Sequence, residues 1–222
     1  MSGKLAIFDC DGTLVDGQAS ICEAMEIAFD AADLPAPDRH SVRRIVGLSL
    51  PQALSELAPS ASGNQRAAAV DAYKSAFRSS RLEGRLQEPL FDGIPELLDR
   101  LRDAGWLLAV ATGKSDRGLF SCLMTHGLND HFVSLQTADR HPSKPHPAML
   151  EAAIADAALI DDAVNTDSAV MIGDTTFDIT MARSARVRSI GVDWGYHTPQ
   201  ELLAEGAEAI ARNPRELGAM LL

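Results

Sequence analysis

The sequence of 222 residues has few cysteines and fewer basic than acidic side chains. The only cysteines are Cys10, Cys22 and Cys122, an odd number without a C-x-x-C pair, so nothing indicates a disulfide framework. This cysteine usage fits a reducing compartment best, and we expect a cytoplasmic protein. Lys and Arg number 20 against 31 Asp and Glu, a net charge of −11. That charge argues against a general nucleic-acid binder, because phosphate backbones attract basic surfaces.

Long apolar runs and nucleotide-binding glycine motifs are also missing. No stretch approaches the ~20 apolar residues of a membrane span, and the apolar run in the N-terminal MSGKLAIFDC is too short for a signal peptide. No G-x-G-x-x-G occurs. Gly113-Lys114-Ser115 resembles the end of a P-loop, but Leu108 stands where that motif needs its first glycine. We therefore expect no membrane and no nucleic acid among the partners, and a monomer or a homodimer.

The apolar fraction of 46% and the charged fraction of 23% are typical of a globular protein. The length allows one substantial core with a smaller unit appended to it. Apolar residues recur at helical spacing between Ala19 and about Gly84, where no strand pattern is convincing. Helices are predicted there over residues 19–32, 41–46, 50–57 and 65–77. The pattern predicts an all-helical unit.

Short apolar runs alternate with amphipathic segments after Pro89. Strands are predicted over 5–8, 106–111, 132–135, 169–172 and 187–192, and helices over 94–104, 115–126, 147–158, 177–185, 199–205 and 214–221. This alternation predicts an α/β fold with a Rossmann-like parallel sheet and helices on both faces. The strand over 5–8 would join the sheet from across the helical unit. We therefore predict a core of residues 1–15 and 87–222 with an insertion over 16–86.

Polar side chains follow the predicted strands at their carboxyl ends, where open parallel sheets bind ligands. Asp9 and Asp11 follow the first strand, Thr112 the second and Asp174 the fourth, and Lys144 precedes a helix. Carboxylates held close together raise each other's pKa unless a cation intervenes. Mg²⁺ is a natural cation for such a site, because it takes carboxylates, waters and phosphate oxygens. The set suits phosphoryl transfer, in which positioning and charge neutralisation provide most of the catalysis.

Four residues of this set also have a simpler interpretation. Asp11-Gly12 is a common turn dipeptide, Lys144 before a proline is typical of a solvated loop, and Thr112 and Asp174 are suitable helix caps. Their occurrence together, in order and each near a strand end, favours a functional site over these separate coincidences.

The motifs resemble those of the haloacid dehalogenase superfamily, in particular its phosphatase branch. They are D-x-D-G-T-L-V-D at 9–16, T-G-K at 112–114, a lysine at 144 and G-D-x-x-x-D at 173–178. The chain looks most like phosphoglycolate phosphatases and their near relatives, and its helical insertion is similar to the cap domain of the superfamily. Two positions depart from the usual pattern: Gly17 stands where relatives often have Ser or Thr, and Gly113 where many have Asn.

The resemblance implies a role for each matching residue. Asp9 would attack phosphorus as a nucleophile, and Asp11 would act as general acid and then as base. Thr112 and Lys144 would be catalytic residues that bind phosphoryl oxygens. Substrate would also approach closely at three positions of the motifs: Gly12, Thr13 and Gly113. Mg²⁺ would be held by four residues: Asp9, Asp11 through its main-chain carbonyl, Asp174 and, through waters or other groups, Asp178.

The expected function is thus Mg²⁺-dependent hydrolysis of a small phosphorylated metabolite, with 2-phosphoglycolate as the best single candidate. A carboxylate at position 11 favours phosphate esters over carbon–halogen bonds, since the dehalogenases of the superfamily lack it. A sugar phosphomutase and a pyrophosphatase of the same fold remain open. So does a regulatory binding protein, although such a relative would be expected to have lost Asp9, Asp11 or Lys144.

Overall fold

The computed structural model describes residues 3–222. Its strands form one parallel sheet of six strands. The strand order is β3-β2-β1-β4-β5-β6. The strands are β1 (Leu5–Phe8), β2 (Leu107–Thr112), β3 (Ser134–Thr137), β4 (Ala169–Gly173), β5 (Arg188–Val192) and β6 (Ala209–Ala211). Strand β1 pairs with β2 on one side and with β4 on the other. The chain order reverses at β1, so the loops after β1, β2 and β4 meet at one edge of the sheet.

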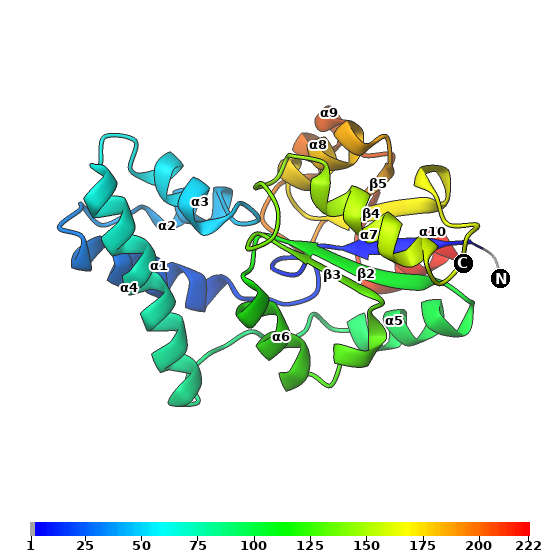
Figure 1. Cartoon of the computed structure of the whole chain (residues 1–222), viewed down its shortest axis with the longest axis horizontal. Coiled ribbons are helices and arrows are strands. Elements are labelled where there is room, and N and C mark those ends of the chain that lie inside the picture. Colours follow the sequence, from blue (N-terminus) through cyan, green and yellow to red (C-terminus); the bar gives the residue numbers. More distant parts are fainter. Residues whose placement is uncertain (1–2) are drawn as a thin grey trace.

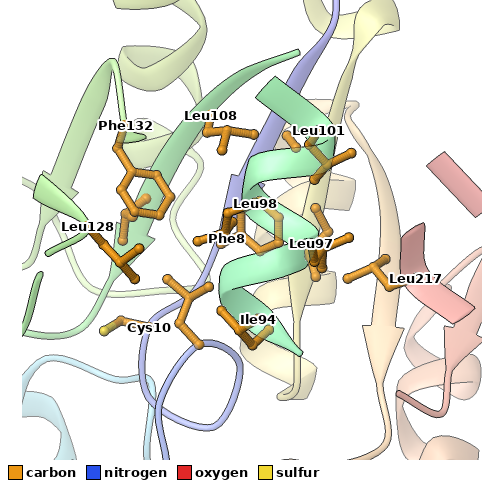
Figure 2. Close-up of a cluster of buried hydrophobic side chains, with 14 of the residues drawn as sticks. Phe8, Cys10, Ile94, Leu97, Leu98, Leu101, Leu108, Leu128, Phe132 and Leu217 are labelled. Atoms are coloured by element: carbon orange, nitrogen blue, oxygen red, sulfur yellow. The ribbon is translucent and has the colours of Figure 1, made fainter. Parts of the chain in front are cut away.

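Successive residues of β1 pack into different hydrophobic clusters, because side chains of a strand alternate between the two faces. Ala6 and Phe8 face the cluster formed with helices α5 (Ile94–Asp103), α6 (Asp116–Thr125) and α10 (Pro214–Leu221). Figure 2 shows Phe8 beneath the apolar face of α5, whose four labelled residues are Ile94, Leu97, Leu98 and Leu101. All four are buried, and the two-sided burial of β1 explains why its sequence is apolar throughout.

The opposite face of the sheet carries helices α7 (Ala148–Ala158) and α8 (Thr176–Ala185). Leu5 and Ile7 point to this side and pack with Met149, Leu150 and Met181. Helix α9 (Pro199–Glu205) contacts α8 and β5 at the same end of the molecule. Figure 1 shows α5 and α6 on one side of the sheet and α7, α8 and α9 on the other. The predicted α/β fold with helices on both faces is therefore confirmed.

Four helices lie between β1 and α5 in the chain: α1 (Gln18–Ala31), α2 (Arg39–Arg44), α3 (Leu50–Leu57) and α4 (Gly63–Leu82). They have a hydrophobic cluster of their own, which includes Met25, Phe29, Val42 and Leu54. Figure 1 shows them in blue to blue-green at the end of the molecule opposite the chain termini. We call this segment the helical insertion. The boundaries predicted for it, 16–86, stay a prediction.

The predicted elements agree with the structure to within a few residues, with two exceptions. Helix α4 extends to Leu82, five residues beyond the predicted end at Phe77, because no Gly or Pro interrupts the chain before Gly84. Strand β6 over Ala209–Ala211 was not predicted. It is an edge strand of three residues, too short for an alternating pattern to be recognised. Across residues 3–222, none of the helices combines the length and the apolar character that a membrane crossing requires.

Candidate active site

Three buried carboxylates come together at the carboxyl edge of the sheet: Asp9, Asp174 and Asp178. Asp9 follows β1, Asp174 follows β4, and Asp178 lies in the first turn of α8. Each offers an oxygen within 4.8 Å of the others. The register of the parallel β1–β4 pair places Phe8 beside Ile172, so the residues that follow the two strands lie close together. The sequence predicted this convergence for Asp9 and Asp174 from their positions at strand ends.

Lys144 lies inside this group and is fully buried. Its Nζ is 2.9 Å from Asp9 Oδ1 and 2.6 Å from Asp178 Oδ1. Burial disfavours an ammonium, but the charges of Asp178 and Asp9 outweigh it and raise the pKa of Lys144. Lys144 is therefore a permanent cation that neutralises part of the acidic group.

Most oxygens of the group are already hydrogen-bonded. The Thr13 hydroxyl donates to Asp174 Oδ1 at 2.8 Å, and the Tyr196 amide donates to Asp174 Oδ2 at 3.0 Å. Asp178 Oδ2 accepts from both the amide and the hydroxyl of Thr175, at 3.0 and 2.8 Å. These bonds fix the orientation of both carboxylates.

The second oxygen of Asp9 differs from the rest of the group. Asp9 Oδ1 accepts from the Cys10 amide at 2.6 Å and faces Lys144, whereas Oδ2 is buried and has no hydrogen-bond partner within residues 3–222. Burial raises the pKa of Asp9 from 3.8 to about 7, despite the opposing charge of Lys144. A buried oxygen without a partner is costly, and it is therefore the atom best placed to bind a cation or to attack an electrophile.

These residues fit a divalent cation. The pKa of Asp174 is raised well above its usual value by burial and by the charges of Asp178 and Asp9. Three carboxylates with one lysine leave an excess of negative charge, and hard oxygen donors are the ligands that Mg²⁺ prefers. Asp9 and Asp174 are the residues that would hold such an ion, with Asp178 beside them.

The carboxylate of Asp11 lies apart from this group, because it faces a second buried lysine. Lys114 Nζ is 3.0 Å from Asp11 Oδ1 and 2.5 Å from Glu88 Oε1. Burial raises the pKa of Asp11, and the charge of Lys114 opposes that rise. The carboxylates of Asp11 and Glu88 raise the pKa of Lys114 even though the lysine is buried. Within this structure the Asp11 side chain is thus oriented by Lys114.

The remaining predicted residues lie around the same edge of the sheet. Thr112 ends β2 and is buried, and its hydroxyl oxygen is 3.3 Å from the Lys114 amide. Gly12 has φ of 83°, and a Cβ there would collide with the Asp174 carboxylate, so the turn after Asp11 requires glycine. The hydroxyl of Thr13 is already bonded to Asp174. The role of Thr13 and of the two glycines in binding substrate stays a prediction.

The helical insertion reaches this edge through the loop between α2 and α3. A Cβ on Gly113 would lie 2.5 Å from the carbonyl oxygens of both Gly47 and Leu48, so two backbones meet here. The Ser49 amide donates to Ser143 Oγ at 2.8 Å. A Cβ on Gly47 would lie 3.8 Å from Asp9 Oδ2. The insertion therefore covers the candidate nucleophile.

Comparison with known proteins agrees with these features. A family model described as haloacid dehalogenase-like hydrolase matches residues 6–192. The chain belongs to this hydrolase family. The family resemblance expected from the motifs is therefore confirmed.

Named relatives of this hydrolase include phosphatases. It is 38% identical over 211 residues to a protein named probable phosphatase IndB from Dickeya dadantii. The aligned region covers 93% of this chain and 88% of the relative. It is 28% identical over 221 residues to a phosphoglycolate phosphatase from Vibrio vulnificus, with 96% and 94% of the chains covered. A crystal structure of a predicted phosphatase from Clostridium acetobutylicum matches with a TM-score of 0.83 and 28% identity, over 98% of this hydrolase and 97% of that chain.

Sequence reasoning missed several residues of the site in this hydrolase. Lys114 was part of a predicted motif but was given no role, and Glu88 gave no signal because it lies in the segment between α4 and α5. Tyr196 follows β5, and its hydroxyl is buried without a partner within residues 3–222. The indirect role expected for Asp178 toward the ion stays a prediction, and its direct contact with Lys144 was not expected. The rule that ligands bind beyond the carboxyl ends of the strands, here called the strand-end rule, does not predict which side chains contact one another.

Proposed function

We propose that this hydrolase is a Mg²⁺-dependent phosphatase that cleaves a phosphomonoester through an aspartyl-phosphate on Asp9. The observation that carries the proposal is Asp9 Oδ2, a buried carboxylate oxygen without a partner, beside a lysine cation and two further carboxylates. Phosphatase names among the relatives support the reaction class. The helical insertion would serve as the cap that excludes bulk water.

The reaction has two steps. In the first, Asp9 Oδ2 forms a bond to phosphorus while the bond from phosphorus to the alcohol oxygen breaks, and Asp11 gives its proton to that oxygen. In the second, Asp11 takes a proton from water as the water oxygen bonds to phosphorus, and the bond to Asp9 breaks. The products are an alcohol and phosphate, and Asp9 and Asp11 return to their initial states.

The side chains of the site have distinct tasks in these steps. Lys144 holds Asp9 Oδ1, which leaves Oδ2 to react, and its charge stabilises the phosphoryl oxygens. The Thr112 hydroxyl binds another phosphoryl oxygen. When bound at Asp9 and Asp174, Mg²⁺ supplies positive charge that offsets the charge on the transferring group. Asp178 orients Lys144 through the contact of 2.6 Å.

The substrate proposed first is 2-phosphoglycolate, because relatives of 28% identity are named phosphoglycolate phosphatases. A sugar phosphomutase shares the first step and returns the phosphoryl group to a sugar, and a neighbour at 18% identity, a structure from Bacteroides vulgatus, is named for that activity. At this identity the likeness shows the fold alone. A pyrophosphatase of the same fold is the third candidate. Mass analysis of the products from glucose 1-phosphate, 2-phosphoglycolate and pyrophosphate separates the three.

Replacement of the nucleophile tests the proposal. Asp9→Asn is expected to lower Mg²⁺-dependent hydrolysis of 2-phosphoglycolate and of p-nitrophenyl phosphate by about 10³-fold or more, because an amide does not form the acyl phosphate. Intact-protein mass spectra of acid-quenched reactions should show an added phosphoryl group in the wild type and none in Asp9→Asn.

The matched control is Asp30→Asn, which makes the same change at an exposed position of α1. It should retain wild-type rates and the mass shift. Normal Mg²⁺-dependent turnover by Asp9→Asn would refute the proposed mechanism. Absence of phosphatase activity together with a stable protein complex would favour the regulatory alternative.

A further inference from the structure

A cavity of about 430 Å³ lies between the helical insertion and the core. Asp11 and Gly113 line it on the core side, and Met25, Gly47 and Tyr73 are among its residues on the insertion side. Because Asp11 is the proposed proton donor to the leaving oxygen, the alcohol part of the substrate must extend into this space. The cavity is therefore the place where the substrate is selected.

Five cations line this cavity: Lys74, Arg78, Arg81, Lys114 and Arg117. Two of them are neutralised, since Lys114 pairs with Asp11 and Glu88, and Arg81 Nη2 is 3.4 Å from Glu88 Oε2. The other three, Lys74, Arg78 and Arg117, form no ion pair within residues 3–222.

The three unpaired cations come from two elements. Lys74 and Arg78 are four residues apart on α4 and so share one face of that helix. Arg117 lies in the first turn of α6, across the cavity. One further carboxylate, Asp139, also lines the cavity, and it accepts a hydrogen bond from the Asp116 amide at 2.9 Å. On a protein of net charge −11, this local excess of positive charge indicates an anionic ligand.

The cavity is large enough for a substrate longer than a two-carbon acid. Pockets of about 300–1,000 Å³ enclose ligands of drug size, whereas 2-phosphoglycolate adds only an acetate unit to its phosphate. Apolar side chains such as Ile21, Met25 and Phe77 also line the cavity. A longer carbon skeleton would contact these residues.

We propose that the leaving alcohol carries a second anionic group at its far end, a carboxylate or a phosphate, and that Lys74, Arg78 and Arg117 bind this group. The inference rests on the proposed phosphatase function and specifies the substrate class. The ion-pair partner of Asp9 is Lys144, so the three cations are separate from the proposed nucleophile and would act on substrate binding.

A matched pair of phosphomonoesters tests the inference. 6-Phosphogluconate and glucose 6-phosphate have the same number of carbons and the same phosphate, but only the first carries a carboxylate at the far end. We expect kcat/KM to be about tenfold or more higher for 6-phosphogluconate, since hydrogen bonds to charged groups contribute this order of selectivity. Comparison of fructose 1,6-bisphosphate with fructose 6-phosphate makes the same test for a phosphate as the second anion.

Arg78→Gln and Arg117→Gln should each raise KM for the preferred substrate with a second anionic group about threefold to tenfold. The effect is smaller than for a fully buried pair, because both side chains are exposed. KM for p-nitrophenyl phosphate, which has no second anion, should change less than KM for that substrate. Arg66→Gln is the control, because Arg66 lies on α4 but does not line the cavity.

The failures of the two proposals are distinguishable. If wild-type protein hydrolyses p-nitrophenyl phosphate but prefers neither anionic substrate, the anion site is refuted and the phosphatase function stands. The same conclusion holds if Arg78→Gln and Arg117→Gln leave the preference unchanged. If no phosphomonoester is hydrolysed, the phosphatase function is refuted and the anion site with it.

Discussion

Two buried lysines divide the acidic side chains at the sheet edge into two groups. Lys144 is 2.9 Å from Asp9 and 2.6 Å from Asp178, whereas Lys114 is 3.0 Å from Asp11. Each lysine therefore stabilises a different carboxylate of the proposed reaction. Such ion pairs hold their geometry well, because loss of either partner leaves a buried charge without its counter-charge.

The stability of the ion-free protein should depend on pH at this site. Burial raises the pKa of Asp9 from 3.8 to about 7 and that of Asp174 well above 3.8. Between these values the native state keeps protons that the unfolded chain has released, so the free energy of unfolding falls as pH rises from about 4 to about 7. Mg²⁺ binds the deprotonated carboxylates and should raise Tm more at about pH 7.5 than at about pH 5.

Thermal denaturation in EDTA and in excess Mg²⁺ at both pH values measures this dependence. Asp174→Asn removes one proposed ligand and should reduce the Mg²⁺-dependent gain in Tm at the higher pH. An equal gain at both pH values, or an unchanged gain in the variant, would contradict the assignment of these carboxylates to an ion.

At the scale of elements, helix and strand ends supply the site. The capping box at the start of α8 pairs Thr175 with Asp178, so the residues that begin this helix also orient an active-site carboxylate. The loop between α2 and α3 meets the turn after β2, where Gly113 faces the carbonyls of Gly47 and Leu48. Because this contact joins two backbones, no flexible side chain can move aside to make room for a larger residue at position 113.

Gly113→Ala tests this contact. Its Cβ would lie 2.5 Å from both carbonyl oxygens, so the loop of the insertion must move away from the core. We expect kcat/KM for the substrate to fall by up to about 10²-fold, because a displacement of about 1 Å near the reacting groups has effects of this size.

The control for this variant is Gly63→Ala at the start of α4, where an added Cβ has no neighbour within 4 Å. This control should keep wild-type kinetics. Urea unfolding should show that Gly113→Ala remains folded. Unchanged kinetics in Gly113→Ala would mean that the close approach of the insertion is not needed for turnover.

At the scale of the whole molecule, the core holds the insertion through a few polar contacts. Nδ1 of the buried His197 accepts from the Thr176 amide at 3.0 Å, and Nε2 lies 3.1 Å from the Arg44 carbonyl oxygen. An amide only donates and a carbonyl only accepts, so the neutral ring has its proton on Nε2. Burial lowers the pKa of His197, consistent with this neutral form. Arg44 also pairs with Glu201 of α9 at 2.8 Å.

His197→Ala should loosen the insertion from the core. It leaves the Thr176 amide and the Arg44 carbonyl without this partner, so we expect the free energy of unfolding to fall by about 1–3 kcal/mol. KM for the substrate should rise, because the closed arrangement becomes less populated. Urea unfolding and steady-state kinetics measure the two effects.

The exposed His40 of α2 provides the control, and His40→Ala should change neither quantity. A His197→Ala variant with lower stability but unchanged KM would show that His197 supports the core alone and does not hold the insertion.

The sequence by itself determined the elements and the residue types of the site. Apolar runs bounded by turn residues located β1, β2 and β4, and the strand-end rule located Asp9, Thr112 and Asp174, because both signals are local in the chain. Strand β6 lacked such a signal, since three edge residues carry no period.

Only the tertiary structure decided which side chains meet. The sequence contains two lysines near the motifs, but their assignment to Asp9 and to Asp11 follows from packing across the sheet. The same holds for Glu88, and for Lys74 and Arg78, whose face on α4 becomes a cavity wall only once the insertion lies over the core. Contacts between residues distant in the chain depend on how the elements pack, and local sequence patterns do not predict that packing.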